Sequence, residues 1–203
     1  MENRLQAVGM IEFNSIAGGI EGADTMVKAA LVEPFMMKTI CPGKFVVAVH
    51  GEVAAVQASV DTGLEFGKDA IIDHFVIPNI SMDVINAIAG TVGDFRGGAA
   101  LGVIETFSAA SCVVAADAAS KAAEVDVLDV RLAMGLGGKA FCLLSGDVGA
   151  VKMAIEAGAA GAAAGGGGKG MRRVDSEAEL EAALRGSRSE ALRHFRSADV
   201  YIE

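Results

Sequence analysis

The 203-residue sequence predicts an α/β fold in which an α/β sandwich, a sheet with helices on one side, occurs twice in tandem. Three observations lead to this prediction. Hydrophobic residues make up 52% of the chain, so a packed core is expected. Segments with strand and helix periodicity alternate in the order βαββαβ. The same short motifs then return in the same order later in the chain, which predicts a duplicated domain.

The elements of the first copy follow one another closely. We expect a strand at 8–13, a helix at 16–31, strands at 35–40 and 45–49, a helix at 52–66, a strand at 70–77 and a short helix at 81–89. The first helix has apolar positions three to four residues apart at Ile20, Ala23, Val27 and Leu31. The second helix carries Val53, Val56, Val60 and Leu64 on one face. Ser81 is the expected N-cap of the short helix.

The repeat can be seen directly in the amino-acid sequence. Residues 8–12 (VGMIE) return as residues 101–105 (LGVIE). Further matches are Ser15 with Ser108, Asp24 with Asp117, Lys28 with Lys121 and Gly51 with Gly146. Two unrelated Ala- and Gly-rich segments, the alternative, would not give so many matches in order. The second copy has a longer loop, residues 131–139, where the first has residues 38–44.

Charge and cysteine content limit the function classes. The net charge is −9 and no basic face is visible, which disfavours nucleic acids and anionic membranes as partners. Cys41, Cys112 and Cys142 form no CxxC pair and their number is odd, so we expect no disulfide framework and a reducing cytoplasm. No uninterrupted apolar run has the length of a membrane span, and the N-terminus does not read as a signal peptide.

The motifs at 8–12 (VGMIE), 29–32 (AALV), 38–45 (KTICPGKF) and 75–78 (FVIP) resemble the bacterial microcompartment domain. The resemblance covers residues 5 to 160, and two such domains in one chain are typical of the tandem-domain shell proteins. It implies a structural shell protein, not an enzyme, in a bacterial microcompartment in the cytoplasm. It also implies a homotrimer that tiles with other microcompartment shell proteins. Two similar domains per chain give a six-lobed ring when three chains close it.

The resemblance divides the chain into three parts. We expect a first shell domain at 1–95, a truncated second shell domain at 96–160 and an atypical segment at 161–203. The second domain lacks its usual last strand, because no counterpart of the strand at 70–77 follows residue 158. One sheet edge of the second copy would then be open unless the C-terminal segment covers it.

In the ring that the resemblance implies, the loops between the second and third strands line the axis. Besides Cys41, these pore-loop residues are Ile40, Pro42, Gly43, Met134, Gly135, Leu136 and Gly137. The chain resembles in particular the tandem shell proteins of propanediol-utilisation compartments. That likeness implies a [4Fe-4S] cluster held by Cys41 from each of three subunits, for electron transfer across the shell. An encapsulated redox enzyme would be a further partner.

Several alternatives stay open at these residues. Cys41 can also be a small apolar residue in a metal-free pore that passes metabolites. Lys44 would offset the negative charge of a cluster. Lys28 and Lys121 match lysines that lie at ring edges in the family. The alternative is that both are ordinary solvated lysines of a helix. Cys112 and Cys142 are expected in the core. No Ser-His-Asp set or paired-carboxylate motif predicts a hydrolytic site.

The last segment resembles a second family, the biotin carboxylases. The matching letters lie at 162–171 (AAAGGGGKGM), 175–181 (DSEAELE) and 200–203 (VYIE). In that ATP-grasp family the glycine-rich loop closes over the phosphates of ATP. An ATP-binding carboxylase fragment is therefore a further alternative function. Because the rest of a nucleotide site is missing, we expect a Gly-rich linker and one helix, with Ser176 and Glu179 as its capping box, and no useful ATP binding.

Overall fold

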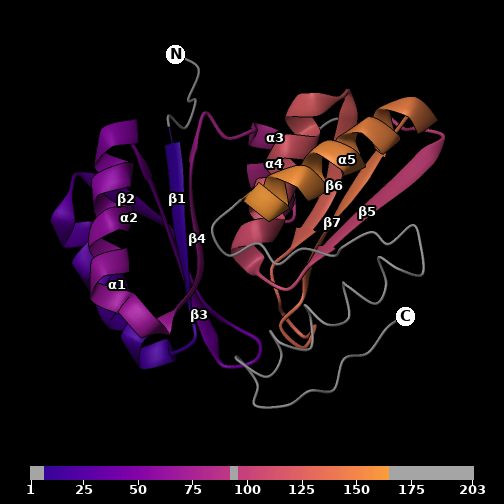
Figure 1. Cartoon of the computed structure of the whole chain (residues 1–203). Helices are drawn as coiled ribbons and strands as arrows, with labels where there is room; N and C mark the ends of the chain where they lie inside the picture. Colours follow the sequence, from indigo (N-terminus) through magenta and orange to yellow (C-terminus); the bar gives the residue numbers. More distant parts are fainter. Residues whose placement is uncertain (1–6, 92–95, 165–203) are drawn as a thin grey trace, which may run out of the picture. The chain divides into compact units, whose positions relative to one another are not determined.

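The computed structural model describes residues 7–91 and 96–164. The first copy contains β1 (Ala7–Phe13), α1 (Ile16–Ala29), β2 (Val32–Ile40), β3 (Lys44–Gly51), α2 (Val53–Gly67), the 3-10 turn η1 (Lys68–Ala70), β4 (Ile71–Pro78) and α3 (Met82–Ile88). The second copy contains β5 (Ala100–Thr106), α4 (Ala109–Ala122), β6 (Val125–Arg131), β7 (Ala140–Gly146) and α5 (Val148–Ala164). Figure 1 shows both copies with their α-helices and strands labelled. Every element predicted for the first copy is present, and the predicted α/β class and duplication are confirmed.

Each copy forms an antiparallel sheet. The first sheet has the order β2-β3-β1-β4, and the second has the order β5-β7-β6. The registers match: Met10 lies opposite Ala48, and Val103 opposite Leu143. Within residues 96–164 no strand takes the place of β4, as predicted for residues 96–160; residues 165–203 lie outside the described part.

Serine side chains begin the first helix of each copy. The Ser15 hydroxyl accepts the N–H of Gly18 at the start of α1, and the Ser108 hydroxyl accepts the N–H of Ser111 at the start of α4. The backbone before each helix is extended, as an N-cap requires. Ser81 is also the N-cap of α3, as predicted, although its hydroxyl accepts no capping hydrogen bond.

The predicted apolar face of α1 is wrong in part. Ile20 is exposed, and Leu31 lies beyond the helix, which ends when Ala30 becomes extended. The buried face is formed by Gly19, Gly22, Ala23 and Met26. A Cβ at Gly19 would lie 2.6 Å from Phe45, so α1 approaches the sheet more closely than a side chain would allow.

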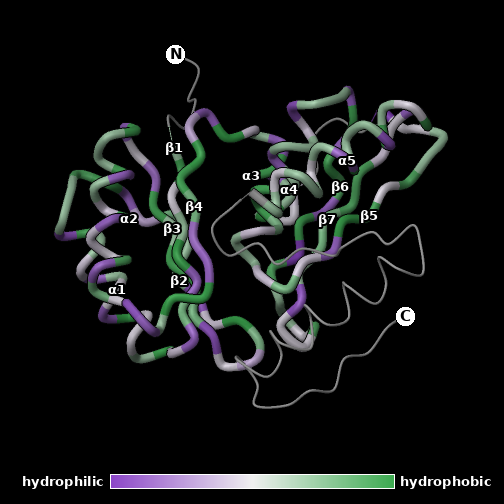
Figure 2. Tube along the Cα trace, in the orientation of Figure 1, coloured by the Kyte–Doolittle hydropathy of each residue, from purple (hydrophilic) through white to green (hydrophobic). Residues whose placement is uncertain are grey.

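The strand β1 is buried on both faces. Ile11 and Phe13 pack with Met26, Val56 and Val60 beneath α1 and α2. Val8 and Met10 point to the opposite face, because side chains alternate along a strand. There they share a second core with α4, β6 and β7 of the second copy. Hydrophobic stretches follow the strands of both sheets (Figure 2). The two copies are therefore joined by a common core.

Two further expectations concern the C-terminal segment and membrane-spanning helices. The capping box at Ser176 and Glu179 and the helix predicted after it lie outside the described residues. Within the described ranges, no helix has the length and apolar character needed to cross a membrane.

Candidate functional site

The loop that carries Cys41 connects β2 and β3 at one end of the first sheet. Pro42 follows through a cis peptide bond, and Gly43 has φ +76°, in the left-handed region. Glycine adopts that conformation without strain, and no atom lies within 4 Å of the position of a Cβ there. Cys41 is half-buried, while Pro42 and Gly43 are exposed. The turn thus presents the cysteine at the end of the sheet.

The corresponding loop of the second copy lies against this turn. The backbone N–H of Cys41 donates to the carbonyl oxygen of Ala133 over 2.9 Å. A Cβ at Gly138 would lie 2.8 Å from Cδ of Pro42, so glycine is needed where the loops touch. Gly135 and Gly137 also have positive φ. The structure therefore brings the two predicted pore loops together within one chain.

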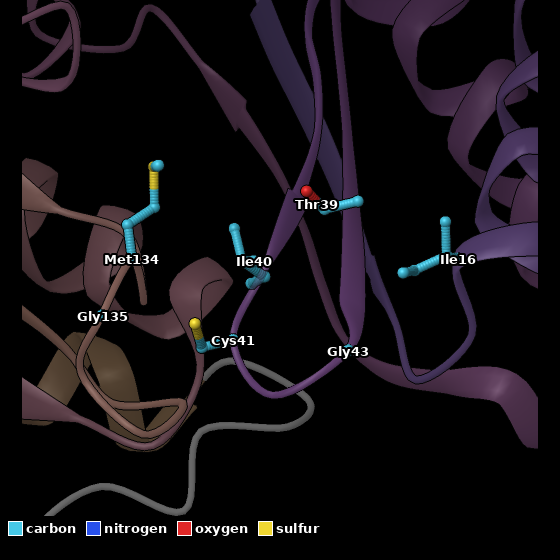
Figure 3. A pocket seen from close by; sticks show the side chains of 7 residues that line it. All are labelled: Ile16, Thr39, Ile40, Cys41, Gly43, Met134 and Gly135. Carbon is cyan, nitrogen blue, oxygen red and sulfur yellow. The ribbon is translucent and has the colours of Figure 1, made fainter.

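An open hollow of about 360 Å³ lies between the two loops. Its lining consists of Ile16, Thr39, Ile40, Cys41, Gly43, Met134 and Gly135. In Figure 3 the sulfur of Cys41 points to the same side of the loops as the side chains of Ile40 and Met134. Of the other predicted pore-loop residues, Pro42, Leu136 and Gly137 are not in this lining. The lining is mainly apolar, with one thiol.

In the described part of one chain, Cys41 has too few neighbouring ligands to hold a metal ion. Among residues 7–91 and 96–164, no three His, Cys, Asp or Glu side chains are grouped so that they could hold a metal ion. The donor set of one chain is thus a single half-buried thiol at a loop tip. It fits an iron–sulfur cluster only if further chains bring the same thiol to one point, since such clusters are normally held by four ligands.

Lys44, which was expected to offset the charge of a cluster, forms an ion pair within the chain. Its Nζ lies 2.8 Å from Oε1 of Glu12 and donates to the carbonyl oxygen of Phe107 at 3.5 Å. Glu12 is completely buried, and its Oε2 accepts the backbone N–H groups of Ala109 and Ala110 at 2.7 and 3.3 Å. The lysine therefore balances a buried carboxylate at the N-terminus of α4, where negative charge is favourable.

A second buried carboxylate, Asp73 on β4, binds the same helix turn. It accepts hydrogen bonds from the hydroxyls of Ser108 and Ser111, and Oδ1 accepts the backbone N–H of His74. Sequence analysis missed both Glu12 and Asp73. The available signal was an acidic residue within each apolar strand, because a carboxylate is seldom buried without partners.

The two predicted ring-edge lysines lie in different surroundings. Lys28 pairs with Asp24 at 2.6 Å, and both side chains are exposed. Lys121 pairs with Asp117 at the same distance, but Asp117 is buried and also accepts the backbone N–H of Ser81. In the first copy this pair lies on the open surface, whereas in the second it fixes the start of α3.

Cys112 and Cys142 are completely buried, which confirms their predicted place in the core. Cys112 lies on α4 and Cys142 on β7. A hydrogen bond with Cys142, together with burial, raises the pKa of the Cys112 thiol. Neither thiol shares the hollow with Cys41.

These features define a class: a duplicated α/β sandwich whose two equivalent loops meet at one end. The family model described as "BMC domain" matches residues 7–80 and again residues 100–171. The chain belongs to this family and carries its domain twice. A model described as "Carbamoyl-phosphate synthase L chain, ATP binding domain" matches residues 150–203, most of which lie outside the described part.

Individual relatives agree with the family. The chain is 43% identical over 150 residues to "Bacterial microcompartment shell protein PduT" of Citrobacter freundii, covering 74% of this chain and 81% of the relative. A crystal structure of a microcompartments protein from Desulfitobacterium hafniense DCB has a TM-score of 0.68 at 45% identity, over 77% of this chain and 87% of the other. The fused permuted hexameric shell protein MSM0275 of the RMM microcompartment has a TM-score of 0.55 at 26% identity, over 74% and 80%. The chain is thus a structural shell protein of a bacterial microcompartment.

Proposed function

We propose that three copies of this chain close into a ring whose pore is lined by the Cys41 and Met134 loops. The observation that carries the proposal is the contact between these two loops, through Cys41 N–H and the Ala133 carbonyl oxygen. Because of this contact, one chain forms two adjacent lobes whose equivalent loops lie side by side. Three chains would then supply six such loops around one axis. The ring would assemble with other shell proteins into the compartment wall.

The pore would hold a [4Fe-4S] cluster through three Cys41 thiolates, one from each chain. The half-buried thiol at a loop tip, in a mainly apolar hollow, supports this assignment. Three thiolates would leave one iron for a ligand that is not a protein side chain. Such a cluster, when bound, transfers single electrons, so the ring would pass electrons between the two sides of the shell. An encapsulated redox enzyme would then be the electron donor or acceptor.

Anaerobic reconstitution with iron and sulfide tests the cluster. The wild type should turn brown and hold one cluster per three chains by iron analysis, and Cys41→Ser should hold none while keeping the mass of the wild type. Cys142→Ala is the control, because its thiol is buried away from the hollow, and it should retain the cluster. Equal iron in Cys41→Ser and wild type, or no iron in either, would exclude the cluster.

The second candidate function is a metal-free pore for small metabolites. The lining of the hollow favours a metal-free pore. Its side chains include the apolar Ile16, Ile40 and Met134, and Cys41 is the only thiol among the lining residues. If the reconstituted wild type holds no iron but has the mass of a trimer, this function stands.

An ATP-binding role is not supported by the described part of the matched region. Residues 150–164 belong to α5, which packs on α4 and β5 as the second helix of the second copy. These residues are therefore used by the shell fold. Calorimetry with Mg-ATP should give no saturable heat, and a micromolar isotherm lost in Lys169→Ala would contradict this expectation.

A further inference from the structure

Two thiols outside the pore hollow lie next to each other in the core of the second copy. Cys112 on α4 and Cys142 on β7 are both completely buried. A hydrogen bond joins their side chains. Since α4 packs on β7, which is the middle strand of its sheet, the pair bridges the interface between the helix and the sheet.

The first copy shows that the fold does not need thiols at these two positions. The counterparts are Gly19 on α1 and Val47 on β3, and both are buried. Val47 lies opposite Ile11 in the first sheet. Cys142 lies opposite Ile104, the counterpart of Ile11, in the second sheet. A small or apolar residue is therefore sufficient for packing, and the two cysteines add chemistry that the packing does not require.

The hydrogen bond gives the two thiols different roles. The bond from Cys112 lowers the pKa of the Cys142 thiol, although burial acts in the opposite direction. The same bond, together with burial, raises the pKa of Cys112, which therefore keeps its proton. The thiolate is the form of cysteine that reacts with oxidants. Cys142 is thus the attacking sulfur, and Cys112 is the neighbouring thiol that can react with the product.

We infer that Cys112 and Cys142 form a reversible disulfide when hydrogen peroxide reaches the core of the second copy. The Cys142 thiolate attacks one oxygen of the peroxide, the O–O bond breaks, and Cys142 becomes a sulfenic acid while hydroxide leaves. The sulfur of Cys112 then attacks the sulfur of Cys142, and the hydroxyl group leaves with the thiol proton as water. In sum, two thiols lose two electrons and two protons, and one peroxide becomes two waters. Because both thiols are completely buried, the oxidant has to be small and uncharged.

The disulfide would join α4 to a sheet that has three strands within residues 96–164, one fewer than the first sheet. The first turn of α4 also binds Glu12 and Asp73 of the first copy, so this helix holds the two copies together. A bond between residues 112 and 142 closes a loop of about 30 residues, which restricts the unfolded chain. Oxidation therefore stabilises the second copy and its junction with the first.

The test uses the full chain with Cys41→Ser, because this change leaves Cys112 and Cys142 as the remaining thiols and makes the result independent of the ring and the cluster. The native protein is treated with hydrogen peroxide, catalase removes the excess, and thiols are counted after unfolding. Two thiols per chain should be found before treatment and none after it. Dithiothreitol should restore both. Trypsin without reductant should release residues 97–121 and 140–152 as one linked species.

The linked chain should also be more stable. At one fixed protein concentration, peroxide should raise the urea midpoint by about 1–2 M, and dithiothreitol should reverse the rise. Cys142→Val is the matched control in the same background, because Val47 fills this position in the first copy. It should be folded by circular dichroism and should gain no stability from peroxide. Cys112→Ala keeps the attacking thiol without its partner, so Cys142 should stop at the sulfenic acid, detected as one added oxygen in the intact mass.

The thiol count decides the proposal even if a control variant fails to fold. Two thiols left in the native chain after peroxide treatment would overturn it. So would a loss of thiols without the linked peptides, because oxidation then ends at separate sulfur acids. A linkage that forms only when urea is present during oxidation would exclude a disulfide in the folded chain, and a doubled mass without reductant would show that the thiols pair between chains instead.

Discussion

Replacing Glu12 with alanine removes the carboxylate on which the junction of the two copies depends. Glu12 is completely buried and pairs with Lys44, which is 15% exposed. It also accepts the N–H groups of Ala109 and Ala110. The variant leaves a largely desolvated ammonium group and two helix N–H groups without their acceptor.

The expected loss in the free energy of unfolding follows from these contacts. Removing one partner of a buried ion pair costs about 3–5 kcal/mol. Each buried N–H group left without an acceptor costs about 1–3 kcal/mol, but such terms are not additive within one network. Since water can reach part of Lys44, we expect ~3–4 kcal/mol for Glu12→Ala. Glu12→Gln keeps an acceptor oxygen and loses only the charge, so ~1–3 kcal/mol is expected.

Urea unfolding followed by circular dichroism measures this loss, at one fixed protein concentration because association shifts apparent stability. With a slope of about 2 kcal/mol per molar urea, the midpoint of Glu12→Ala should fall by ~1.5–2 M. Glu124→Gln is the control, because Glu124 is 84% exposed and pairs with an exposed arginine. Its midpoint should equal that of the wild type. A Glu12→Ala midpoint no lower than the control would refute the reasoning.

Two further predictions concern packing and thiol access. Gly9→Ala should cost about 1–3 kcal/mol in thermal unfolding, because its Cβ would lie 2.5 and 2.7 Å from two buried valines of α2; Gly149→Ala, with no atom within 4 Å, should be neutral or stabilising. In metal-free protein, a thiol reagent should modify Cys41 rapidly and Cys112 and Cys142 only after unfolding, since the last two are completely buried. Equal rates for all three would contradict the burial.

Much of the fold follows from local patterns. The strand at β1, the N-cap Ser81 and the core position of Cys112 were all predicted from spacing or composition. The absence of a fourth strand within residues 96–164 was predicted as well, because the repeat stops matching after residue 158. The assignment of Cys41 to a pore cluster stays a prediction, because it depends on contacts between chains.

Other features could not be predicted from the amino-acid sequence. Apolar periodicity placed Ile20 on the buried face of α1, whereas glycines at 19 and 22 let that helix approach the sheet and leave Ile20 exposed. Periodicity counts side chains and therefore misses a face made of glycine. The ion pair of Lys44 was not predicted either, since its partner Glu12 lies on another strand.

The sequence by itself determined the elements, their order and the duplication, because all of these depend on neighbouring residues and on short motifs that recur. Only the tertiary structure decided which face of each sheet is covered and which carboxylates meet the turn of α4. Glu12 and Ala109 are 97 residues apart, and a hydrogen bond between residues so far apart in the sequence produces no periodic pattern in either segment. For the same reason Val103 and Met10 look alike in sequence, although the second copy of the chain covers only Met10.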